Sequence, residues 1–129
     1  MQAKLNRPLS SVVALFMFCA FCAGAHAAPE EIVAKFDAWP PETVTVNQFY
    51  ECALTATDAN GVGKTGLHLQ VRGRMPEHAH GLPTAPQISE EGQGRYRIKG
   101  LSFNMPGRWV IDILRDDVSV LRQELTVRF

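Results

Sequence analysis

The feature that most constrains this chain is an alternation of apolar and polar residues that recurs in short runs. Side chains of a β-strand point alternately to opposite faces, so a period of two is typical of strands with one buried face. Turn-forming sequences separate the runs at intervals of about 8 to 12 residues, the clearest being Asp58-Ala59-Asn60-Gly61. The pattern predicts an all-β fold, an immunoglobulin-like antiparallel β-sandwich of about seven strands. The runs lie at residues 43–46, 49–56, 67–71, 95–99, 109–113 and 121–129.

The same alternation predicts which side chains form the core. Cys52 shares a face with Leu54, so we interpret it as a small buried hydrophobe; the alternative, a copper thiolate, requires it to face a loop. A lone cysteine in an exported domain also leaves no internal disulfide. The predicted core consists of Leu54, Leu69, Val71, Ile98, Phe103, Trp109, Ile111 and Leu125.

The N-terminal residues have the pattern of a secretory signal. Lys4 and Arg7 precede residues 9–25, which contain no charge, and Ala25-His26-Ala27 is a small-x-small cleavage site. Cleavage predicts a periplasmic or secreted protein without a membrane span, and an uncleaved anchor is the alternative. The predicted division is a signal peptide at 1–27, a leader at 28–38 that is helical or disordered, and a sandwich domain at 39–129.

Charge excludes some partners. Without Lys4 and Arg7 the chain has slightly more acidic than basic residues, and no run of basic residues is present. We therefore expect neither nucleic acid nor an anionic membrane surface as a partner.

The heptapeptide Met75-Pro76-Glu77-His78-Ala79-His80-Gly81 concentrates a thioether and two imidazoles in one loop. In an extended segment His78 and His80 point the same way, and Met75 is flexible enough to reach the same ion. Thioether with imidazole favours copper, especially Cu(I). A second turn, Met105-Pro106-Gly107, offers another sulfur. The sequence predicts a copper site with the ligands Met75, His78, His80 and Met105, although core packing is the alternative for Met105.

The loop is part of a longer pattern. The Met75-Pro76-x-His78-x-His80-Gly81 loop is followed by Gly94-x-Tyr96 and by Gly100-Leu101-x-Phe103-x-Met105-x-Gly107-x-Trp109. Over residues 40–127 the chain resembles the YtkA-like domains, which are related to FixH. The resemblance implies a small exported or membrane-anchored β-sandwich linked with copper handling and cytochrome oxidase assembly. The ligand types also resemble the His/Met sites of periplasmic Cu(I) chaperones, but the chain lacks the permanent anchor of FixH-type proteins.

Two functions follow from these observations. The first is a non-catalytic periplasmic copper-binding or copper-delivery protein that passes the ion to an envelope protein. The alternative is an exported interaction module whose histidines are structural and bind no metal. We do not expect an enzyme, because the sequence shows no paired nucleophile and base, and a hydrolytic metal site would need a further ligand and a bound water.

Overall fold

The computed structural model describes residues 24, 27–41 and 43–129, so most of the predicted signal peptide lies outside the described residues. Every regular element in the described part is a β-strand. Within these ranges we find no helix with the length and apolar character needed to cross a membrane.

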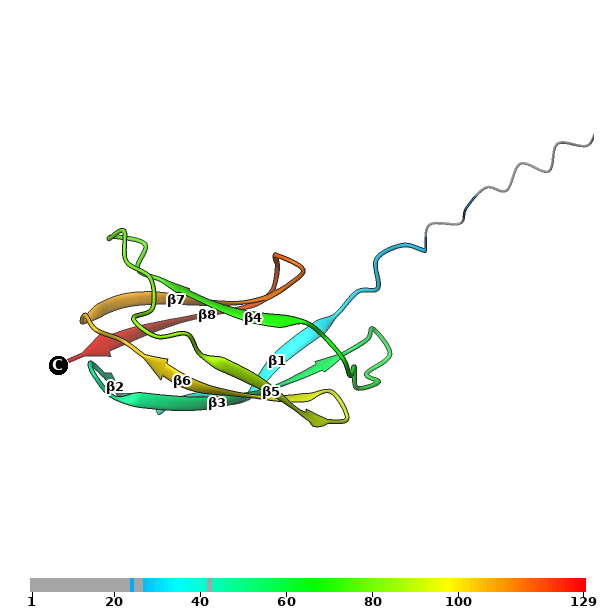
Figure 1. Cartoon of the computed structure of the whole chain (residues 1–129), viewed down its shortest axis with the longest axis horizontal. Coiled ribbons are helices and arrows are strands. Elements are labelled where there is room, and N and C mark those ends of the chain that lie inside the picture. The colour runs from blue at the N-terminus through cyan, green and yellow to red at the C-terminus, as the bar shows by residue number, and fades with distance from the viewer. Residues whose placement is uncertain (1–23, 25–26, 42) are drawn as a thin grey trace, which may run out of the picture.

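The strands form two four-stranded sheets that lie face to face (Figure 1). One sheet, called sheet A, has the order β1-β3-β6-β5, and the other, sheet B, has the order β2-β8-β7-β4. Neighbouring strands are antiparallel, except that β2 pairs with β8 in parallel. The prediction of an all-β, immunoglobulin-like sandwich is confirmed. The strands are β1 (Val33–Ala38), β2 (Val44–Thr45), β3 (Phe49–Thr57), β4 (Leu69–Arg74), β5 (Gln87–Gly92), β6 (Arg95–Ser102), β7 (Gly107–Arg115) and β8 (Val118–Arg128).

The sandwich begins earlier than predicted. Strand β1 lies inside the segment 28–38 that was expected to be a helical or disordered leader, and it pairs with β3 along five positions. Ala34 and Phe36 are half-buried while Lys35 and Asp37 are exposed, so the alternation of a strand extends into this segment. The boundary expected at residue 39 is therefore too late, and β1 and the short β2 bring the number of strands to eight.

Most of the predicted core is buried. Leu54, Ile98, Phe103, Trp109 and Ile111 are fully enclosed between the sheets. The remaining three, Leu69, Val71 and Leu125, are half-buried and pack against the core from its margin. Leu69 and Val71 are less enclosed because β4 is the last strand of sheet B, so only one neighbouring strand covers it.

Strand β7 differs from the other strands because both of its faces are buried. Trp109, Ile111 and Ile113 face the core, and the residues between them are almost as inaccessible. β7 lies between β8 and β4, whose long outward side chains flank the outer face of β7. β7 is thus the buried inner neighbour of β4, and β4 forms the edge of sheet B.

Candidate functional site

The predicted metal loop is a tight turn at the end of β4. Arg74 pairs with Gly81 in an isolated antiparallel bridge. Within the turn, the Met75 N–H donates to the carbonyl oxygen of His80 at 3.1 Å, and the His78 N–H donates to the carbonyl oxygen of Met75 at 3.2 Å. The loop is therefore held at both ends and projects from the layer that contains β4 and β7 (Figure 1).

The structure brings the two Met-Pro turns to one end of the sandwich but gives their methionines different positions. Met75 is 3% exposed and belongs to the core. Its methyl group would lie only 3.0 Å from a Cβ placed on Gly107, so the absence of a side chain at Gly107 makes room for it. Met105 is half-buried at the margin of the core, and its carbonyl oxygen accepts a hydrogen bond from the Trp109 indole at 3.0 Å.

The two histidines, unlike Met75, are exposed and adjacent. The ring centroids of His78 and His80 are 6.1 Å apart, with an angle of 49° between the ring planes. A metal–nitrogen bond of about 2 Å puts an ion about 3 Å from each ring centroid, so this spacing is near the limit at which both rings can bind one ion. In the described ranges no three or more His, Cys, Asp or Glu side chains are grouped so that they could hold a metal. The four predicted ligands are thus divided between a surface pair and two sulfurs at or in the core.

Cys52 has the packing role that the alternation predicts. It is 2% exposed, and burial raises the pKa of its thiol to about 12. A thiol with such a pKa stays protonated near neutral pH, which agrees with a packing role for Cys52 rather than a reactive thiolate.

A cleft along the open side of the sandwich is the feature that the sequence analysis missed. It lies between β4 and β5, the last strands of the two sheets, and has a volume of about 590 Å³. Its lining includes the half-buried apolar side chains of Leu69, Val71, Leu82 and Ile88. The bridge from Arg74 to Gly81 is the only backbone pairing that the described residues make on this side of β4.

One glycine shapes the cleft. A Cβ on Gly73 would lie 2.5 Å from the Leu82 side chain and 2.9 Å from that of Ile111, so only glycine allows Leu82 to pack there. Leu82 in turn fills the gap between the two edge strands at the end of the cleft nearest the histidine turn. A glycine inside a strand often marks a close approach of another segment. Gly73 is therefore the one feature of the sequence that could have pointed to this cleft.

The outer face of sheet B carries arginines around one buried carboxylate. Asp112 is 4% exposed; its Oδ1 accepts from Arg122 Nε at 2.7 Å and from the Ser119 hydroxyl at 3.0 Å. Arg74 Nε lies 4.0 Å from the other carboxylate oxygen. The hydrogen bond from Arg122 is the main reason that the pKa of Asp112 is lowered, with Ser119 and Arg74 as further causes. On β4, Arg72 lies directly opposite Asp112 of β7, and Arg72 is exposed.

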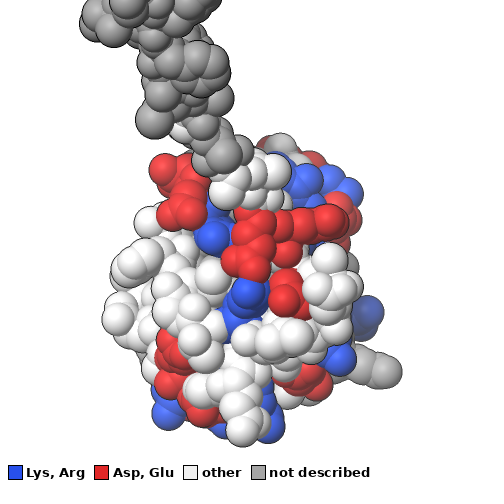
Figure 2. Space-filling view, turned by 90° about the vertical axis from the view of Figure 1, so that its right-hand side faces the viewer, with Lys and Arg blue, Asp and Glu red and all other residues white. Residues whose placement is uncertain are grey.

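The opposite end of the molecule is where the chain enters the sandwich. Figure 2 looks onto this end and shows acidic side chains grouped there, with basic side chains between them. Glu30, Glu31 and Asp116 lie together with Arg115 around a shallow depression of about 500 Å³. This end is separate from the turn at residues 75–81, which lies at the other end of the long axis (Figure 1).

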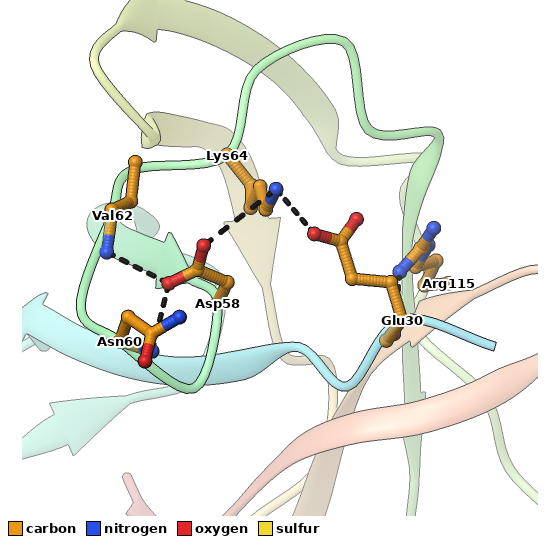
Figure 3. Close-up of polar contacts among 6 residues, drawn as sticks. All are labelled: Glu30, Asp58, Asn60, Val62, Lys64 and Arg115. Atoms are coloured by element: carbon orange, nitrogen blue, oxygen red, sulfur yellow. Dashed lines mark hydrogen bonds and ion pairs between the residues drawn. The ribbon is translucent and has the colours of Figure 1, made fainter. Parts of the chain in front are cut away.

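Polar contacts attach the entering segment to two loops (Figure 3). The Lys64 ammonium pairs with Glu30 and lies 3.8 Å from Asp58, while Arg115 donates to the Glu30 carbonyl oxygen at 3.3 Å. Asp58 accepts from the backbone N–H groups of Asn60 at 2.9 Å and Val62 at 3.0 Å. The bond from Val62 is the largest cause of a lowered Asp58 pKa, and the bond to Glu30 raises the Lys64 pKa. These contacts hold the loop at Asp58 and the entering segment at Glu30 in place.

Comparison with known proteins identifies the fold and nothing narrower. No protein-family model matches the sequence, and no curated protein matches it. Among solved structures, the filamin domain of Lin-41 is similar with a TM-score of 0.58 and 10% identity, over 74% of this chain and 91% of that one. FdeC, an Escherichia coli adhesin, has a TM-score of 0.59 and 19% identity over 79% of this chain and 33% of its own. The ZirS C-terminal domain has a TM-score of 0.51 and 15% identity over 100% of this chain and 87% of that domain.

At these identities the likeness shows a shared fold alone. The filamin and adhesin domains agree with the immunoglobulin-like arrangement of the two sheets. The resemblance to YtkA-like domains stays a prediction, because no family model matches the chain.

Proposed function

We propose that this protein is an exported, non-catalytic interaction module that binds a partner protein through the β4–β5 cleft. The fold supports this proposal, because its structural neighbours include a domain of an adhesin and a filamin domain. The predicted signal peptide supports export. The proposal replaces copper delivery as the leading hypothesis.

The observation that carries the proposal is the cleft itself. It combines four apolar side chains in a mixed lining with the free edge of β4, and a free edge offers backbone N–H and C=O groups to another chain. Proteins that bind extended segments often add them to such an edge, with apolar pockets for alternate side chains. This arrangement supports a role in recognition, and the residues that line the cleft include no paired acid and base.

Site-specific photo-crosslinking tests the proposal. Gln87 is exposed on β5 and lines the cleft, so it is replaced by the photoreactive residue p-benzoyl-L-phenylalanine. The matched control carries the same residue at Lys35, which is exposed on β1 at the opposite edge of sheet A. The purified domain is irradiated in envelope extract of the cells that produce it.

We expect one defined protein adduct from position 87, none from position 35, and loss of the adduct when unlabelled domain is added in excess. Equal adducts from both positions, or an adduct that unlabelled domain does not reduce, would show that the cleft is not the binding surface.

A second function, copper binding at His78 and His80, is favoured by one specific observation. The two rings are exposed and adjacent, with a centroid spacing near the limit at which both can bind one ion. Met75 is part of the core in this arrangement, so the histidines are the ligands presented at the surface, with Met75 and Met105 as further candidates from the adjoining turns. The resemblance to YtkA-like domains belongs to this second proposal.

Titration of the purified domain with Cu(I) against a competing chelator tests it. We expect His78→Ala combined with His80→Ala to abolish binding without loss of the fold, because the turn belongs to a complete domain. Met75→Leu keeps the volume and removes the sulfur, so a larger loss of affinity for Cu(I) than for Cu(II), each relative to the unchanged protein, identifies Met75 as a ligand. Protons compete with the metal for imidazole, so affinity should fall on acidification. Unchanged Cu(I) affinity in the double variant would rule out this site.

A further inference from the structure

We infer that the partner of the β4–β5 cleft is an extended acidic peptide segment that adds to sheet B as a strand beside β4. Its alternate apolar side chains face the cleft, and an acidic side chain lies next to Arg72. This inference rests on the proposed function, and it adds the backbone geometry and the side-chain chemistry of the partner.

The direction of the free backbone groups follows from the histidine turn. The Met75 N–H donates to His80 on the side of β4 that faces away from β7. In a strand, alternate residues direct their N–H and C=O groups to the same side. β4 pairs with β7 from Leu69 to Arg74 without a register shift, so the backbone groups of Val71 also point to the free edge. An added strand therefore finds correctly directed donors and acceptors beside the cleft.

The inward side chains of an added strand meet the apolar side chains of the cleft. A strand that joins a sheet continues its two faces, so every second side chain lies on the face shared with Leu69 and Val71. That face looks into the cleft, where Leu82 and Ile88 complete the lining. Small or branched apolar side chains fit this side of the partner.

The outward side chains meet arginine. Arg72 is exposed and forms no ion pair with another described residue, whereas Arg74 is 4.0 Å from the buried Asp112. The residue directly opposite Arg72 on an added strand has its Cβ about 4.5–5.5 Å away, within reach of an ion pair. The planar guanidinium binds a carboxylate with two parallel hydrogen bonds. Charge complementarity thus selects Asp or Glu at that position of the partner.

Selection from a random-peptide display library tests both parts of the inference. Peptides bound by the intact domain should show alternating apolar residues with Asp or Glu between them. A synthetic copy of an enriched peptide is then N-methylated at single backbone positions. We expect alternating positions to lose binding, because only every second N–H faces β4, while the intervening positions retain it.

The charge preference is tested on the protein. Arg72→Glu should weaken binding of the acidic peptide by about five-fold or more, which corresponds to the loss of an ion pair of about 1 kcal/mol. The same variant should select basic residues when the library is screened again. Arg95→Glu is the matched control: Arg95 is exposed on β6 in the other sheet, so the same change of net charge should leave binding unaltered.

The outcomes distinguish the cleft as a binding surface from the geometry and charge of its partner. Alternating N-methyl effects without a response to Arg72→Glu would retain the cleft as a binding surface and overturn the acidic preference. N-methyl effects without alternation would overturn strand addition. Failure to enrich any peptide that competes with the crosslink at position 87 would contradict the proposed function together with the inference.

Discussion

The outer faces of the two sheets follow the same alternating pattern but bury their charges to different depths. On sheet A, Glu51 lies 3.7 Å from both Arg97 and Lys99, and these three side chains are 39% to 59% exposed. On sheet B, the side chain of Asp112 is 6% exposed, and it accepts hydrogen bonds from Arg122 and Ser119. The sequence pattern gives Glu51 and Asp112 the same outward position, and only the neighbouring strands distinguish them.

The difference shows that an outward position does not determine the energetic weight of a charge. Exposed ion pairs contribute little because water and salt screen them. A carboxylate removed from water depends on its hydrogen bonds, and removing them leaves a buried group without compensation. We therefore expect sheet B to be sensitive to a change at Asp112 and sheet A to tolerate a change at Glu51.

The core between the two sheets should show the largest loss of stability when it is mutated. Trp109 is fully buried, and its ring meets that of Phe103 edge-to-face with the centroids 5.2 Å apart. Trp109→Ala leaves a large cavity between both sheets, so we expect a loss of about 3–5 kcal/mol in unfolding free energy, measured by chemical denaturation. A loss below about 1 kcal/mol would mean that the interior is not the main source of stability.

The buried carboxylate should show the next largest effect. Asp112→Ala removes the acceptor for Arg122 and Ser119, and we expect a loss of about 1–2 kcal/mol in unfolding free energy. Glu124→Ala is the matched control on the same face, since Glu124 is exposed and its contact with Arg108 is 3.3 Å long. Equal losses in the two variants would remove the distinction between buried and exposed charges on sheet B.

Acidification should reduce the contribution of Asp112 through its lowered pKa. Because Arg122 holds the folded-state pKa below the unfolded value of about 3.9, the contribution is fully present above that value and is lost as the pH falls through the folded pKa. The difference in unfolding free energy between the protein and Asp112→Asn should therefore narrow as the pH falls below about 3.9. Denaturation curves over a pH series measure it, and a difference that stays constant contradicts the assignment.

The fold was predictable because the period of two reports directly on burial. It identified Leu54, Ile98 and Trp109 as core residues and gave Cys52 its packing role. It failed at Val33–Ala38, where the same alternation was present but was assigned to a leader. It also gave no warning that Asp112 is buried, since that depends on which strands flank β7.

The candidate sites were less predictable than the fold. The sequence identified a histidine turn that the structure places at the surface, but it gave no information on whether Met75 points to the histidines or to the core. The β4–β5 cleft requires knowing that β4 and β5 end their sheets on the same side of the sandwich. Such a surface depends on sheet order, which local patterns do not specify.

The exposed pairs of sheet A should show the smallest effect. Glu51→Ala removes both contacts at 3.7 Å, yet Arg97 keeps its pairing with Glu91 at 2.5 Å, and Lys99 remains solvated. We therefore expect no change in the denaturation midpoint beyond experimental error at physiological ionic strength. The same comparison at low salt should show at most a small destabilisation, since screening is weaker there. A loss for Glu51→Ala that equals the loss for Asp112→Ala would mean that depth of burial does not distinguish the two outer faces, and that the charges of sheet A form a cooperative network.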